Sequence, residues 1–224
     1  MAERWFPTIV HRISTGARAI LEKMTESEKA YYERRALEYD DWYLGTGLFA
    51  DRVRPRWHEE VETVRAVLRS LPVRFAIDVA CGTGFLTQHL PGRVIALDQS
   101  PAMLKLARER LAAGSAIQGD AFHLPFRDRA FDCLLASHFY GHLREEDRLR
   151  FLAEARRVAE RTLIIDAALR DDVPPEQVQE RVLNDGSRHT VYKRFFTPAQ
   201  LIEELGGARV LFAGRWFVAA LAVC

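Results

Sequence analysis

The chain has 224 residues, 48% of them hydrophobic, and its 32 Lys and Arg nearly balance its 31 Asp and Glu. This length is enough to bury a substantial core within one domain. A net charge of +1 argues against a nucleic-acid partner, because a nucleic-acid footprint usually makes a whole domain strongly basic. No apolar run is long enough to cross a bilayer, so we expect no stable membrane insertion. The three cysteines, Cys81, Cys133 and Cys224, lack paired or metal-ligand spacing and predict reduced thiols in a cytoplasmic protein. We expect a monomer or homodimer.

The first 26 residues contain a basic stretch with apolar residues at helical spacing. This pattern predicts an accessory helix, or an extension translated ahead of a natural start at Met24. Membrane-surface contact or organelle targeting is the alternative, because basic amphipathic helices serve both purposes.

Residues 27–71 predict a helical segment in two parts. Residues 27–51 have helical spacing and are rich in Tyr and Trp, and residues 55–71 form an amphipathic pattern that Pro72 ends. The apolar face of the second part contains Trp57, Val61, Val64, Val67 and Leu68.

From residue 75 onward, short β-branched runs alternate with helical stretches. The runs are FAIDVA, RVIALD, AIQGD, FDCLLAS, RTLIIDAAL, ARVLFAG and WFVAALAV, and the helical stretches cover residues 86–90, 101–113, 145–158 and 198–205. Such alternation predicts an α/β fold with a doubly wound, mostly parallel seven-stranded sheet of the Rossmann-like kind. A short turn around Gly214 separates the last two runs, so we expect a terminal hairpin with one antiparallel strand at the sheet edge.

Residues 170–197 interrupt this alternation. The segment is rich in charge and turn residues, and we expect it to form a substrate-side insertion above the carboxyl ends of the strands, within a single domain of residues 27–224. Its cations Arg181, Arg188, Lys193 and Arg194 are candidates to bind an anionic acceptor, although charge in a loop is usually solvated.

A glycine turn follows the first strand, in AIDVACGTGF (residues 76–85). A nucleotide approaches the backbone closely at this position of a parallel sheet, which requires residues without bulky side chains. The dinucleotide fingerprint fails because its third glycine is Thr87, and the phosphate-binding loop fails because no Gly-Lys-Ser/Thr follows.

The pattern that fits is D-x-A/G-x-G-x-G, filled by Asp78, Ala80, Gly82 and Gly84. It resembles motif I of the class I S-adenosylmethionine-dependent methyltransferases, and Ala80 is a departure from glycine seen in small-molecule members such as the ubiquinone and menaquinone methyltransferases. VIALDQS and IQGDAFHLPF resemble the second and third strand motifs of the family. The resemblance covers roughly residues 31–223.

The resemblance implies S-adenosylmethionine as cofactor and a set of residues that bind it. Asp98 would accept hydrogen bonds from the ribose hydroxyls and Asp120 from the adenine amino group, whereas the bland alternative for Asp120 is a turn cap. The implied set comprises Tyr39, Asp78, Ala80, Cys81, Gly82, Gly84, Asp98, Gln99, Asp120, Ala121, Phe122, Ala136 and Ser137.

The same resemblance implies methyl transfer to a small-molecule acceptor by in-line displacement, for which a general base is needed only when the acceptor arrives protonated. His138, Tyr140 and His142 follow the fourth strand and are the candidate catalytic residues; capping and packing are the alternatives. In the amino-terminal lid, Tyr39 would reach the cofactor, while Trp42 and Tyr43 would face the acceptor.

On the substrate side, Arg194 is the remaining candidate.

Asp132 and Asp166 flank strands without a nameable third ligand, so we expect no metal. Two other functions stay open: an NAD(P)-dependent oxidoreductase and a non-catalytic S-adenosylmethionine-binding partner protein. Amino-methylation of nucleic acid is disfavoured because Ser137-His138-Phe139 replaces an Asn-Pro-Pro-Tyr motif.

Overall fold

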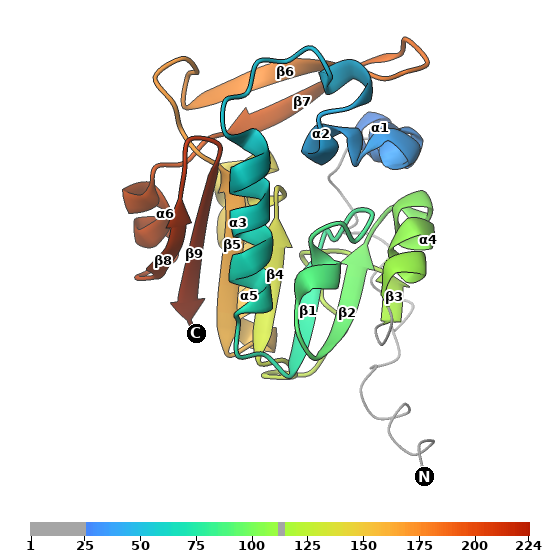
Figure 1. Cartoon of the computed structure of the whole chain (residues 1–224). Helices are drawn as coiled ribbons and strands as arrows, with labels where there is room; N and C mark the ends of the chain where they lie inside the picture. Colours follow the sequence, from blue (N-terminus) through green and yellow to red (C-terminus); the bar gives the residue numbers. More distant parts are fainter. Residues whose placement is uncertain (1–25, 112–114) are drawn as a thin grey trace.

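The computed structural model describes residues 26–111 and 115–224, so nearly all of the expected accessory segment, residues 1–26, lies outside it. Its main element is a seven-stranded sheet in the order β3-β2-β1-β4-β5-β9-β8 (Figure 1). The strands are β1 (Phe75–Val79), β2 (Arg93–Asp98), β3 (Ser115–Gln118), β4 (Cys133–Ser137), β5 (Arg161–Ala167), β8 (Arg209–Ala213) and β9 (Phe217–Val223). The helices are α1 (Glu26–Arg35), α2 (Asp41–Leu44), α3 (Trp57–Arg69), α4 (Pro101–Arg110), α5 (Glu145–Val158) and α6 (Pro198–Glu204).

The predicted fold class is confirmed. Strands β1 to β5 pair in parallel, and β9 pairs antiparallel with both β5 and β8. The expected terminal hairpin lies at one edge of the sheet: β8 is the edge strand, and β9 lies inside it, between β8 and β5. Residues 217–220 of β9 are all buried, whereas β8 is half-exposed along its length, so burying the more apolar strand decides the order.

Helices cover both faces of the sheet, as a doubly wound fold requires. Helix α3 packs Val61, Val64 and Leu68 against one face, and α5 packs Phe151 and Ala155 against the other. Side chains of β1 alternate between the two clusters because successive residues of a strand point to opposite faces.

Two segments form a roof over the carboxyl ends of the parallel strands (Figure 1). Residues 27–51 make short helices and 3-10 turns instead of one continuous helix, and Gly45, at φ +68°, ends α2. Residues 170–197 contain a two-stranded antiparallel hairpin, β6 (Glu176–Val182) with β7 (Arg188–Arg194). Along β6, half-buried residues alternate with exposed ones, so Gln177, Gln179 and Arg181 face the same side.

The two roof segments contact one another. Tyr31 of α1 packs with Leu183 and Val191 of the hairpin in a small apolar cluster. The backbone N–H of Asn184 donates to the carboxylate of Glu38 at 2.9 Å. The roof is therefore assembled from segments about 150 residues apart in the chain.

Candidate active site

The glycine turn after β1 has the backbone conformation that its sequence predicts. Ala80, Gly82 and Gly84 have φ values of +57°, +55° and +77°, a region that suits glycine and strains Ala80. A Cβ atom on Gly84 would lie 3.2 Å from the Cα of Ala107 in α4. A Cβ atom on Gly82 would lie 3.2 Å from the Tyr39 ring. The turn thus lets α4 and the amino-terminal segment approach the backbone closely.

Asp98, at the end of β2, ties this turn to the neighbouring loop. One carboxylate oxygen accepts from the Gly82 N–H at 2.8 Å, and the other accepts from the Ser100 N–H at 2.9 Å. Burial raises the pKa of Asp98, while these backbone donors oppose the rise. The Gln99 backbone is a third donor to this carboxylate. A carboxylate has about four lone-pair sites, so it can still accept a further donor, such as a hydroxyl.

Asp78 lies completely buried at the end of β1. Its Oδ2 accepts from the Thr87 hydroxyl at 2.5 Å, and its Oδ1 has no hydrogen-bond partner within residues 26–111 and 115–224. Burial raises the pKa of Asp78 to about 7. A buried acceptor without a donor is costly, so this atom suits a ligand group that donates hydrogen bonds or carries positive charge.

Asp120 caps its own turn in this structure. Its carboxylate accepts from the Phe122 N–H at 2.9 Å and contacts Nδ1 of His123 at 2.9 Å. Ala121 and Phe122 are half-buried beside it. The contact of Asp120 with adenine stays a prediction. Part of the Asp120 side chain is exposed and accessible to a ligand.

The other expected cofactor residues lie around the same strand ends. Ala136 and Ser137 are buried at the end of β4, and Gln99 directly follows β2. Burial raises the pKa of the Cys81 thiol, so the thiol is neutral at physiological pH and packs as an apolar group.

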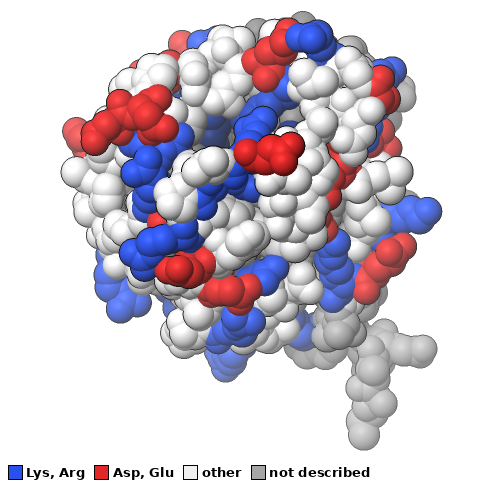
Figure 2. Space-filling model, turned by 45° about the horizontal axis from the view of Figure 1, so that its top comes forward, with Lys and Arg blue, Asp and Glu red and all other residues white. Residues whose placement is uncertain are grey.

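Under the roof lies a cavity of about 210 Å³. Figure 2 looks toward this end of the molecule and shows Lys and Arg side chains gathered around a hollow. The cavity is lined by Tyr31, Tyr32, Arg35, Tyr39, Trp42, Arg52, Arg54, Trp57, His138, His142, Ala167, Arg170, Val173, Gln179, Arg181, Val191, Lys193, Phe195 and Trp216. Tyr39 belongs to this lining and also packs against Gly82, so it forms a wall between the glycine turn and the cavity.

Polar contacts hold the amino-terminal segment against the glycine turn. Asp40 accepts from the Thr83 hydroxyl at 2.6 Å and also pairs with Arg110 of α4. Glu33 accepts from the Ser100 hydroxyl at 2.5 Å. Both tethers reach across more than 40 residues of chain, and they orient Tyr39 over the turn.

His138 and His142, two of the three candidate catalytic residues, both line the cavity. Burial lowers the pKa of His138 to about 3, and its buried Nε2 has no partner in the described part of the chain. Burial is the main cause that lowers the pKa of His142, and the charge of Lys193 lowers it further. His142 Nδ1 lies 2.7 Å from the carbonyl oxygen of Tyr192, which only accepts, so Nδ1 carries the proton and Nε2 is free to accept.

Four other sequence candidates lie away from the cavity lining. Tyr140 is completely buried and donates its hydroxyl to Glu204 at 2.7 Å. Tyr43 is buried and stacks on Phe85, with ring centroids 4.2 Å apart. The remaining two, Arg188 and Arg194, form ion pairs with acidic residues across the hairpin. Trp42, Arg181 and Lys193 do line the cavity.

Sequence reasoning missed most of the cationic lining. Arg35, Arg170 and the neighbouring pair Arg52 and Arg54 come from three places in the chain, and no spacing rule joins them. The only local signal was the cluster DRVRPR at residues 51–56, which by itself indicates a solvated turn.

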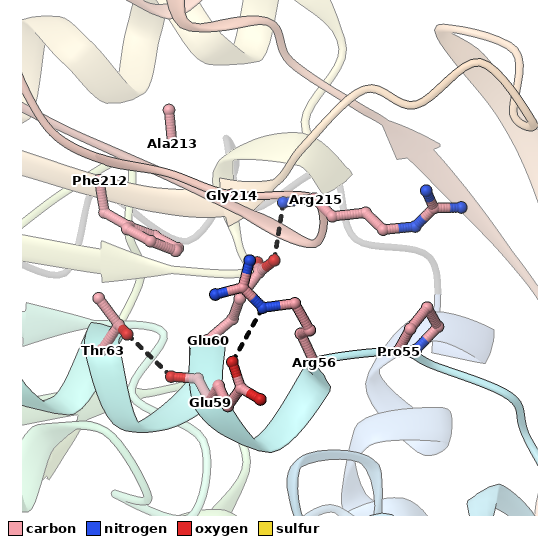
Figure 3. Close-up of a pocket in the computed structure, with 9 residues that line it drawn as sticks. All are labelled: Pro55, Arg56, Glu59, Glu60, Thr63, Phe212, Ala213, Gly214 and Arg215. Atoms are coloured by element: carbon pink, nitrogen blue, oxygen red, sulfur yellow. Dashed lines mark hydrogen bonds and ion pairs between the residues drawn. The ribbon is translucent and has the colours of Figure 1, made fainter.

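A second hollow, of about 630 Å³, lies between α3 and the β8–β9 turn (Figure 3). Its central carboxylate, Glu60, accepts from the backbone N–H groups of Arg215 at 2.8 Å and Trp216 at 2.9 Å. At its rim, Glu59 pairs with Arg56. Glu60 thus joins α3 to the turn between β8 and β9.

Within residues 26–111 and 115–224, no group of three or more His, Cys, Asp or Glu is arranged to hold a metal ion. The same residues include no helix with the length and apolar character needed to cross a membrane.

Comparison with known proteins adds independent observations. Residues 77–162 match the family model described as "Methyltransferase domain". The chain is 34% identical over 135 residues to a demethylmenaquinone methyltransferase of Thermotoga maritima, covering 58% of this chain and 56% of that protein. It is 42% identical over 92 residues to a phthiotriol/phenolphthiotriol dimycocerosates methyltransferase of Mycobacterium tuberculosis, covering 37% of this chain and 32% of that protein. The chain thus spans about half the length, or less, of these curated relatives.

Among solved structures, the chain is similar to one described as "DhpI-SAM-HEP complex", with a TM-score of 0.72 and 28% sequence identity. This match covers 88% of this chain and 95% of the other. It is also similar in fold to a glycopeptide N-methyltransferase, MtfA, complexed with sinefungin, with a TM-score of 0.56, 23% identity, and coverage of 72% of this chain and 92% of that one.

Proposed function

Since the chain belongs to the class I S-adenosylmethionine-dependent methyltransferases, we propose that it transfers a methyl group from S-adenosylmethionine to a small molecule bound in the cavity under the roof. One observation carries this proposal: Tyr39 packs against Gly82 and also lines the cavity. A cofactor at the glycine turn and an acceptor in the cavity would therefore share one wall. Fixing two reactants side by side supplies much of the acceleration of a bimolecular displacement.

The residues at the strand ends fit the groups of this cofactor. S-adenosylmethionine supplies a methyl group on a positively charged sulfur, which becomes a neutral thioether when the methyl group leaves. Asp98 would accept the ribose hydroxyls, and the unpartnered Oδ1 of Asp78 would accept from the α-ammonium group. Phe122 and Asp120 would border adenine, and Ser137 would lie beside the methionine part.

The histidines of the cavity suit an acceptor that loses a proton. Nε2 of His142 is held unprotonated by the bond from Nδ1 to the Tyr192 carbonyl, and the Nε2 of His138 has no partner. Because burial lowers both pKa values, either group is a weak base and would take only an acidic proton. An acceptor that arrives already ionised would need neither histidine as a base.

The two rival functions receive less support. A nicotinamide oxidoreductase would use the third glycine that Thr87 replaces. A non-catalytic partner protein would have no need of a cavity that shares a wall with the cofactor turn. The near-neutral charge favours a small molecule over a nucleic acid as the acceptor. The three free cysteines favour the cytoplasm. The proposed assembly is a monomer or homodimer.

The cofactor assignment is tested by Asp98→Ala. We expect the variant to stay folded and to bind S-adenosylhomocysteine about 10- to 100-fold more weakly, because charge-assisted hydrogen bonds to two hydroxyls are lost. Isothermal titration calorimetry measures the affinity. The matched control is Asp132→Ala, since Asp132 also accepts two backbone N–H groups but at the opposite ends of the strands. Equal affinity in Asp98→Ala and the wild type would refute the proposed site.

The role of His142 is tested separately with His142→Ala. We expect methyl transfer to slow about 100-fold or more, with unchanged affinity for S-adenosylhomocysteine, if His142 takes the acceptor's proton. Single-turnover kinetics and thermal unfolding distinguish the two possible roles. A fall in unfolding temperature with normal turnover would assign His142 to packing.

A further inference from the structure

The cavity under the roof concentrates positive charge in a chain that is almost neutral overall. Five arginines and one lysine line it, and no aspartate or glutamate does. The whole chain has nearly equal numbers of the two signs, with a net charge of +1. The cavity is therefore an exception to the average composition, and it needs an explanation of its own.

Two of the six cations have carboxylate partners. Lys193 pairs with the buried Asp166, and burial and this partner act in opposite directions on the pKa of Lys193, which is lowered overall. Arg170 pairs with Asp172 at 2.9 Å. Within the described ranges, Arg35, Arg52, Arg54 and Arg181 have no ion pair. We call these four residues the arginine cluster.

Arg52 and Arg54 enter the cluster from the turn between the 3-10 helix at Gly47–Phe49 and α3. Arg54 donates to the Trp42 carbonyl oxygen at 2.8 Å and lies 3.8 Å from the Trp57 ring centroid. Burial lowers the pKa of Arg54 to about 10, and the charge of Arg52 lowers it further in the same direction. Arg52 is exposed, so it borders the opening of the cavity.

Arg35 and Arg181 enter from the two halves of the roof. Arg35, on α1, contacts the Tyr31 hydroxyl, and its Nε is buried without a partner. Arg181, on β6, contacts the side chain of Gln179. Burial lowers the pKa of Arg181, and the charges of Arg35 and Arg52 contribute to that shift. The arginines thus repel one another across the cavity.

Arg35, Arg54 and Arg181 are half-buried. Cations that lose water without gaining a counter-charge destabilise the folded protein unless a ligand supplies the missing charge. Arginine is suited to that ligand's acidic group, because its planar fork donates two parallel hydrogen bonds to a carboxylate or a phosphorus oxyacid. The cavity, at about 210 Å³, is smaller than a typical pocket for a drug-sized ligand, which is about 300–1,000 Å³.

We propose that the methyl acceptor is a small organic oxyanion, a carboxylate or a phosphorus oxyacid, whose acidic group is bound by Arg52, Arg54 and Arg181. The identification of the bound anion as the methyl acceptor rests on the proposed function. The anion site itself does not. Arg35 completes the positive field from the side of α1. The rest of the acceptor would lie toward Trp42, His138 and Tyr39, the wall shared with the cofactor.

Binding of simple anions tests the site without knowledge of the acceptor. Trp42, Trp57 and Trp216 all line the cavity, so intrinsic tryptophan fluorescence reports its occupancy. The full chain is titrated with inorganic phosphate and with acetate, against sodium chloride at matched ionic strength. We expect saturable quenching or enhancement by phosphate, acetate or both, and a smaller, non-saturating effect of chloride. Phosphate alone would select a phosphorus oxyacid, and acetate alone a carboxylate.

Substitutions then locate the site. We expect Arg52→Gln and Arg181→Gln each to weaken binding of the effective anion about tenfold, because each removes charge-assisted hydrogen bonds. The matched controls are Arg56→Gln and Arg188→Gln, which remove arginines of the same two segments that pair with Glu59 and Glu180 outside the cavity. The controls should bind the anion as the wild type does.

Affinity for S-adenosylhomocysteine, measured on the same proteins by calorimetry, separates this proposal from the previous one. All four variants should retain it, which also shows that they fold. Anion binding that is equal in all variants, or no saturable response to phosphate and acetate, would overturn the proposed oxyanion site. A wild-type protein that does not bind S-adenosylhomocysteine would instead refute the proposed function, and the anion result would still stand.

Discussion

At the scale of single residues, Asp78 combines a structural cost with the ligand-binding role proposed for it. Its carboxyl is completely buried, with a pKa raised to about 7 by burial and one oxygen unpartnered in the described part of the chain. Such a group is retained when its ionised form meets a cation that arrives with the ligand. The proposed α-ammonium of the cofactor would be that cation.

Asp78→Asn should therefore stabilise the cofactor-free protein and weaken cofactor binding. In the wild type, the folded state holds a proton that the unfolded state has released between about pH 4 and pH 7, so this carboxyl lowers the free energy of unfolding as pH rises through that range. The variant should be the more stable protein at pH 8, with little difference near pH 4. Urea unfolding at both pH values measures this.

The same substitution tests the pH dependence of cofactor binding. Wild-type affinity for S-adenosylhomocysteine should fall as pH drops below about 7, because protonated Asp78 must release its proton to pair with an ammonium group. Asp78→Asn should bind weakly, without this pH dependence. A pH profile shared by both proteins would contradict the assigned role.

At the scale of elements, the amino-terminal segment is held over the glycine turn by the rings of Tyr39 and Tyr43 and by a small set of polar contacts. Asp40 bonds to the Thr83 hydroxyl and pairs with Arg110, and these contacts orient Tyr39 against Gly82. The loss of one polar contact lowers the free-energy cost of opening such a segment. Opening of this lid is therefore a suitable step for cofactor exchange.

Asp40→Ala should speed release of S-adenosylhomocysteine about three- to tenfold, which corresponds to ~1 kcal/mol of lost lid contact. Stopped-flow fluorescence measures the rate. Asp41→Ala is the matched control, because Asp41 accepts from the Thr46 hydroxyl within the lid. Addition of Thr83→Val to Asp40→Ala should have little further effect. Equal release rates in the Asp40 and Asp41 variants would argue against the lid.

At the scale of the whole molecule, a carboxylate joins the first half of the chain to its last strands. Glu60 of α3 is buried and accepts from the backbone N–H groups of Arg215, Trp216 and Phe217, at 2.8, 2.9 and 3.3 Å (Figure 3 draws Glu60 and Arg215). Without the Glu60 carboxylate, these three backbone N–H groups, at and just before the start of β9, would lose their hydrogen-bond acceptor.

Glu60→Ala should lower the free energy of unfolding by about 2–4 kcal/mol, because buried donors are left unsatisfied. Glu59→Ala should change it by less than about 1 kcal/mol, since the pair between Arg56 and Glu59 is exposed. Urea unfolding compares the two, and folded Glu60→Ala should keep its affinity for S-adenosylhomocysteine. A similar effect of both substitutions would show that Glu60 is not an anchor.

Much of the fold could be predicted because its determinants are local. Strand runs, helix boundaries such as residues 145–158, and the glycine turn follow from periodicity and steric rules over a few residues. The inner position of β9 could not be predicted, because the turn at Gly214 dictates only that the two last strands run in opposite directions. Which strand is buried depends on how well each packs against β5.

The sequence by itself determined that Asp78, Gly82 and Asp98, the proposed cofactor residues, lie together, because they follow consecutive strands, and parallel strands end at the same edge of a sheet. Only the tertiary structure decided what lies beside that site. Arg52 and Arg181 are 129 positions apart by their numbers, and no local pattern relates them; they meet because two roof segments fold over the same edge. Backbone geometry is a property of neighbours in the chain, whereas the charge of a cavity is the sum over segments that folding brings together.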